Sequence, residues 1–117
     1  MAWLNDEMQG LDPEYELQDE LNIYRKFVNC MEVWDAWEAG AYLDSRDGIQ
    51  WALEQLDGQQ VDEDILREIE ELDEKLKSFA DHLTNELKLF EQIYRDDPKE
   101  HWWWYLDELV RGKKNDS

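Results

Sequence analysis

The chain has 117 residues, of which 31 are acidic and 12 are basic, so its formal net charge is −19. This charge argues against binding to a nucleic-acid backbone, which needs a basic surface, and against binding to an anionic membrane. The apolar share of 42% suits one folded domain, and five glycines with two prolines are few for a protein of strands and turns.

The N-terminal half is predicted to contain one long helix followed by a shorter one. Residues 1–11 form a lead-in segment, and Asp12-Pro13 has the residue types that begin a helix. Two apolar rows with alternating spacings of four and three predict that this helix runs over 13–40. We expect its second row to be buried, and this row consists of Ile23, Phe27, Cys30, Trp34, Trp37 and Ala41.

The stretch 44–48 is predicted to be a loop because it is rich in Asp, Ser and Gly. A short helix should follow over 47–58, since Asp47 and Gln50 have the spacing of a capping box. The longest helix is predicted over 62–94, with its apolar stripe including Leu76 and Leu83.

The C-terminal helix is predicted to begin at Asp97-Pro98 and to end near Gly112, with a frayed tail over 113–117. The two long helices should pack together as a hairpin. The predicted fold class is therefore all-α, a long antiparallel helical hairpin with two shorter helices, which makes a three- or four-helix bundle. We expect one acidic domain over 1–117, and a homodimer is an alternative because the helix over 62–94 is predicted to outreach its partner.

We predict no catalytic residue, no cofactor and no metal site. The glycines are isolated, so no phosphate-binding loop is present. The two histidines, His82 and His101, lack the neighbouring ligands of a metal motif, and the acids do not have EF-hand spacing. We expect Cys30, the single cysteine, to be a buried and inert thiol.

The N-terminal residues have neither a basic region nor a long apolar run, so they do not resemble a secretory signal. No apolar run approaches the roughly 18 residues of a membrane helix. We therefore expect a cytoplasmic protein.

Aromatic residues are concentrated near the C-terminus, where three tryptophans follow one another from Trp102 to Trp104. Consecutive helical residues are about 100° apart, so the three cannot share a face. With Trp102 and Leu109 in the core, Trp104 would point away from it, either exposed or covered by a neighbouring segment. An exposed tryptophan with a polar rim is typical of interface hot spots, and the predicted partner-binding residues are Trp104, Trp103, Glu100, Asp107 and Glu108.

Acidic residues are concentrated over 62–74, which contains eight acids and one base. A solvated helix face that keeps the protein soluble would explain them, and so would a surface that a basic protein recognises. The predicted acidic surface consists of Glu63, Asp64, Glu68, Glu70, Glu71, Asp73 and Glu74.

Together these patterns favour a non-catalytic interaction or regulatory protein. We expect it to bind a protein partner through an aromatic and acidic helical surface, which suits a partner with a basic surface, and not to bind nucleic acid directly. The alternative is an acidic inhibitor that mimics nucleic acid and blocks a basic nucleic-acid-binding protein. The two differ in their response to salt, because binding by mimicry should weaken steeply as salt is added.

Overall fold

The computed structural model describes residues 12–56, 61–93 and 97–116, and the side chains up to residue 112. The predicted lead-in segment, 1–11, lies outside the described residues. Within these ranges the regular elements are helices and none is a strand, so the predicted all-α bundle is confirmed. The helices in chain order are α2 (Pro13–Asn29), α3 (Ala36–Gln55), α4 (Glu63–Ser78), α5 (Leu89–Gln92) and α6 (Leu106–Asp116).

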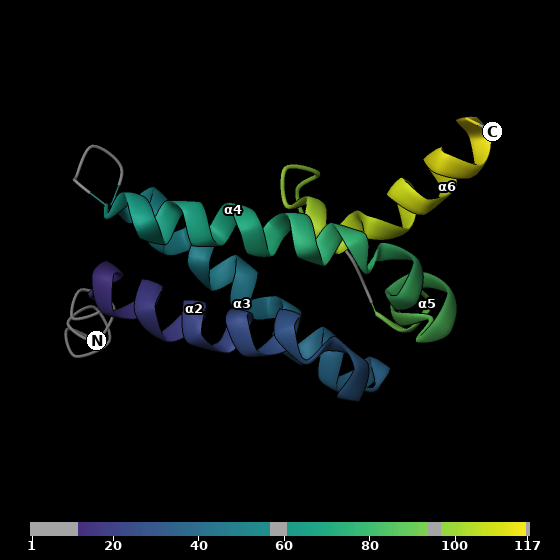
Figure 1. Cartoon of the computed structure of the whole chain (residues 1–117), viewed down its shortest axis with the longest axis horizontal. Helices are drawn as coiled ribbons and strands as arrows, with labels where there is room; N and C mark the ends of the chain where they lie inside the picture. The colour runs from purple at the N-terminus through teal and green to yellow at the C-terminus, as the bar shows by residue number, and fades with distance from the viewer. Residues whose placement is uncertain (1–11, 57–60, 94–96, 117) are drawn as a thin grey trace, which may run out of the picture.

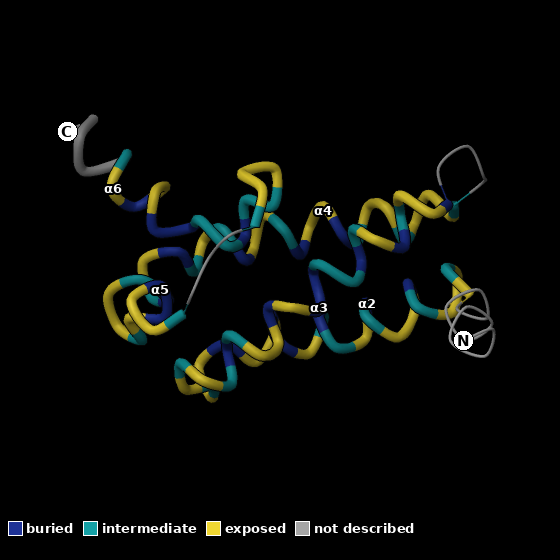
Figure 2. The backbone as a smooth tube through the Cα atoms, turned by 180° about the vertical axis from the view of Figure 1, so that it is seen from behind, coloured by how far each residue is buried: buried dark blue, intermediate teal, exposed yellow. Residues whose placement is uncertain are grey.

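The first three of these helices form the body of the molecule. α2 and α4 lie along its long axis, and α3 returns obliquely between them (Figure 1). The closest packing is between α2 and α3, so the predicted pairing of the first and longest helices is replaced by a pairing of consecutive helices. The buried residues lie where the helices face one another (Figure 2).

The predicted helix over 13–40 is wrong, because two helices occupy this region. α2 ends where the indole N–H of Trp34 donates to the carbonyl oxygen of Phe27 at 3.0 Å, which satisfies a carbonyl of the last turn. α3 then begins at a capping box formed by Asp35 and Glu38.

Three residues of the row that was predicted to be buried are exposed, and one of them is Ala41 on α3. Cys30 follows the last turn of α2 and is exposed, so the prediction of a buried thiol is wrong. Trp37 lies in the first turn of α3 and is 81% exposed.

The predicted loop over 44–48 lies within α3 and is helical. Two of the residues that suggested a loop, Asp47 and Gly48, have tertiary contacts here. Gly48 leaves room for the side chain of Glu20 on α2, since a Cβ atom at Gly48 would lie 2.6 Å from its Cγ. The close packing of α2 on α3 therefore stabilises a helix here, although the local composition favours a loop.

The predicted helix over 62–94 ends early. Asp62 caps α4 as expected, but this helix stops at Ser78 and is followed by a π-helical turn, His82–Glu86. Lys88 then adopts a left-handed conformation with φ of 54°, which ends the helical path before α5. The overhang that suggested a homodimer is therefore absent from the described chain, whereas Leu76 and Leu83 are fully buried, as predicted.

The last helix begins later than predicted. Asp97 and Pro98 belong to a turn, a 3₁₀ helix spans Trp102–Tyr105, and α6 continues past Gly112 to Asp116. The tighter 3₁₀ winding changes the rotation of the tryptophans relative to an α-helix. As a result Trp103, rather than Trp102, is fully buried.

Among the described residues, no helix is both long enough and apolar enough to cross a membrane.

Candidate functional site

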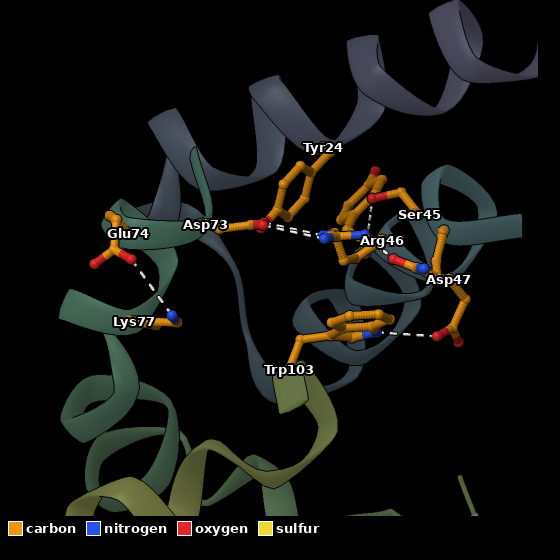
Figure 3. Close-up of polar contacts among 10 residues, drawn as sticks. Tyr24, Ser45, Arg46, Asp47, Asp73, Glu74, Lys77 and Trp103 are labelled. Atoms are coloured by element: carbon orange, nitrogen blue, oxygen red, sulfur yellow. Dashed lines mark hydrogen bonds and ion pairs between the residues drawn. The ribbon is translucent and has the colours of Figure 1, made fainter. Parts of the chain in front are cut away.

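A nearly buried ion pair joins the three helices of the body. Arg46 on α3 donates two hydrogen bonds to Asp73 on α4, at 2.9 and 3.0 Å, and the side chains are 7% and 14% exposed. The hydroxyl of Tyr24 on α2 donates to the same carboxylate at 2.7 Å (Figure 3). Burial raises the pKa of Tyr24, and the charge of Asp73 raises it further.

A second cluster is built around Asp47, one residue further along α3. Its carboxylate accepts hydrogen bonds from the indole N–H groups of Trp103, at 2.9 Å, and Trp104, at 3.1 and 3.0 Å. The guanidinium of Arg46 lies 4.5 Å from the centre of the Trp103 ring, which connects the two clusters (Figure 3). Burial raises the pKa of Asp47, the indole donors lower it, and the neighbouring Asp44 raises it.

Two further side chains converge on Asp47. Each of Asp47, Asp97 and His101 offers one carboxylate oxygen or imidazole nitrogen, and these three atoms lie within 4.8 Å of one another. All three residues are partly buried. The His101 ring stacks on Trp103, with ring centres 4.8 Å apart and planes 16° apart. The structure therefore joins α3 to the turn before α6 through a polar cluster that no local sequence motif indicated.

The predicted partner-binding residues do not form one exposed surface. Trp103 is buried, and Trp104 is half-buried with its indole directed to Asp47, so the predicted outward position of Trp104 is wrong. Asp107 is also buried and accepts a hydrogen bond from Arg111 at 2.9 Å. Two of the set are exposed, Glu100 and Glu108, and Glu108 accepts a hydrogen bond from Lys99.

An apolar groove lies beside Trp104, between α3 and the α5 region. It has a volume of about 410 Å³ and a lining in which apolar side chains predominate. Trp37 stands at this groove with most of its surface exposed. Sequence analysis missed the exposure of Trp37 because helical periodicity placed this residue in a buried row. The capping-box spacing of Asp35 and Glu38 was the signal that could have located the start of α3. The lining residues are Ala36, Trp37, Gly40, Ala41, Gln92, Ile93 and Trp104.

The predicted acidic surface divides into an exposed part and a paired part. At about 100° per residue, the exposed acids lie within a sector of roughly 120° on α4, opposite its buried stripe. Glu68 instead accepts a hydrogen bond from Arg25 at 2.9 Å, and this donor lowers the pKa of Glu68. Asp73 belongs to the ion pair with Arg46. The exposed acids are Glu63, Asp64, Glu70, Glu71 and Glu74.

Comparison with models of protein families, with curated proteins and with solved structures finds no match to this chain.

Proposed function

We propose that this chain is a non-catalytic regulatory or interaction protein that binds a protein partner, with Trp37 as the anchor of the contact. The observation that carries the proposal is the 81% exposure of Trp37 beside an apolar groove. Large aromatic side chains next to apolar pockets are typical of binding hot spots. Val33, in the short 3₁₀ helix that precedes α3, is a second large apolar side chain with high exposure, at 69%.

The charges near the groove indicate the chemistry of the partner. Asp35 and Asp44 are exposed acids next to or on α3, and Glu91 is an exposed acid on α5. Arg46, the basic residue of α3, is buried in its ion pair with Asp73 and is not available to a partner. A segment that combines apolar and basic side chains, such as a basic amphipathic helix, complements this surface best.

The alternative is an acidic inhibitor that mimics nucleic acid. It is favoured by the sector of exposed acids on α4, where Glu70 and Glu74 lie about 6 Å apart along the helix axis. That distance is close to the roughly 7 Å between alternate phosphates of one strand. Arg67 is exposed within the same sector and reduces its negative charge, so we rank this function second.

The experiment is capture of partners from an extract of the source cells on immobilised wild-type protein, followed by elution with rising salt. We expect a partner that stays bound at high salt, because apolar contacts are not screened. Trp37→Ala should weaken capture at least tenfold, about 1.4 kcal/mol, while leaving the free energy of unfolding within about 0.5 kcal/mol.

The matched control is Trp51→Ala, which removes the less exposed tryptophan near the other end of α3. We expect it to retain the partner. Equal capture by wild type and Trp37→Ala would refute the anchor role. Release of all partners by moderate salt would favour the nucleic-acid mimic instead.

A further inference from the structure

We propose that Asp47, Asp97 and His101 form a binding site for one divalent transition-metal ion, with Zn²⁺ as the ion that fits best. Two carboxylates and one imidazole are ligands that zinc accepts, and three protein ligands leave a fourth position for water. This inference is independent of the proposed binding function and departs from the expectation, drawn from sequence spacing, that the chain has no metal site.

The separation of the groups suits a metal ion. The Nδ1 atom of His101 lies 3.2 Å from Oδ1 of Asp47. Two neighbouring ligands of a tetrahedral zinc ion are roughly 3.4 Å apart, given metal–ligand bonds of about 2.1 Å. All three groups offer an atom within 4.8 Å of the others, so these atoms must move closer to one another to coordinate one ion.

One ring nitrogen of the cluster is buried without a hydrogen-bond partner. Nδ1 of His101 is inaccessible to solvent and has no hydrogen-bond partner, although it lies beside the Asp47 carboxylate. The contact lacks hydrogen-bond geometry, so a proton on Nδ1 would not join the two groups well. A metal ion bound to Nδ1 would give this buried nitrogen the partner that it lacks.

The surrounding residues fix the side chain of one ligand, Asp47, and the backbone of the other two. The indole N–H groups of Trp103 and Trp104 fix the Asp47 carboxylate, and the hydroxyl of Tyr105 donates to the backbone carbonyl of Asp97. The backbone N–H of His101 donates to the carbonyl of Pro98 at 2.9 Å. The two indole contacts correspond to the outer hydrogen bonds that orient ligand side chains in known metal sites.

A bound ion would link two parts of the chain that are far apart in sequence. Asp47 belongs to α3, whereas Asp97 and His101 belong to the turn that precedes α6. A metal ion would therefore attach the C-terminal part of the described chain to the helical body, close to the groove that Trp104 lines.

The test is a titration of untagged, chelator-dialysed protein with Zn²⁺ in competition with a chromogenic chelator. We expect one equivalent to bind to the wild type, with a change in tryptophan fluorescence because two indoles donate to the ligand Asp47. His101→Gln and Asp97→Asn should each weaken binding at least tenfold. Excess Mg²⁺ should not compete, which separates this site from loose binding to surface acids.

The matched control is His82→Gln, which removes the other histidine and should change the Zn²⁺ affinity less than twofold. Zinc should also raise the melting temperature of the wild type and of His82→Gln, but not that of His101→Gln, because binding to the folded state stabilises it. Circular dichroism checks that each variant is folded. Absence of stoichiometric zinc from the wild type, or equal zinc affinity of the wild type and both ligand variants, would overturn the proposal.

Discussion

Asp73 and Glu74 are adjacent acids on α4 with opposite surroundings. Asp73 accepts hydrogen bonds from Arg46 and Tyr24 in a nearly buried site, whereas Glu74 is exposed and lies 3.4 Å from Lys77. Removing one partner of a buried ion pair leaves an uncompensated charge, which costs about 3–5 kcal/mol. An exposed pair contributes at most about 1 kcal/mol.

We therefore expect Asp73→Ala to lower the free energy of unfolding by about 3–5 kcal/mol, and Glu74→Ala to change it by less than about 0.5 kcal/mol. Denaturant melts of the two variants measure both values. Similar effects of the two substitutions would mean that the link between Arg46 and Asp73 does not stabilise the packing of α3 on α4.

At the scale of single residues, sequence pattern predicted the aliphatic core better than the aromatic and polar positions. Leu76 and Leu83 are buried as predicted, since helical spacing reports directly on the face that an aliphatic side chain occupies. Trp104 was misplaced because its indole follows a hydrogen bond to Asp47, 57 residues away in sequence. Periodicity contains no information about such a partner.

At the scale of elements, the stability of the packing between α2 and α3 depends on pH. Glu20 packs over Gly48, and burial, together with the charges of Glu16, Asp19 and Asp44, raises its pKa from 4.5 to about 7. The folded state therefore binds this proton more tightly than the unfolded state. The stability that protonation of Glu20 contributes is complete below about pH 4.5 and is lost as the pH rises through about 7.

We expect Glu20→Gln to be more stable than the wild type at pH 8, by about 1 kcal/mol after allowance for solvent screening. The difference should shrink as the pH falls towards 5. Denaturant melts over this range measure it. The control, Glu71→Gln on the exposed face of α4, should keep the pH dependence of the wild type. A constant difference between Glu20→Gln and the wild type across this range would contradict the expectation.

The beginnings of two helices were predictable and the interruptions were not. Asp12-Pro13 and Asp62 cap α2 and α4 as their residue types indicated. The break between α2 and α3 depends on the side chain of Trp34, and the end of the helical path after α4 depends on the left-handed backbone of Lys88. In both places the apolar spacing continues through the break, so periodicity alone predicted helices that were too long.

At the scale of the whole molecule, the described residues measure 51 × 34 × 26 Å and present two surfaces of different chemistry. One is the apolar groove with Trp37, and the other is the acidic sector of α4. Only the acidic one was visible in the sequence, because charge is read from composition. The groove arises from the way α3 and the α5 region meet, and this meeting depends on the unpredicted end of α4 at Ser78.

The most direct test of the proposed function is an amide chemical-shift map of isotope-labelled protein mixed with its captured partner. We expect the largest shift changes at Trp37, Ala41 and Ile93, and little change along the exposed face of α4 between Glu63 and Glu74. Large changes along that face, with the groove unaffected, would contradict the proposal and would favour mimicry of nucleic acid.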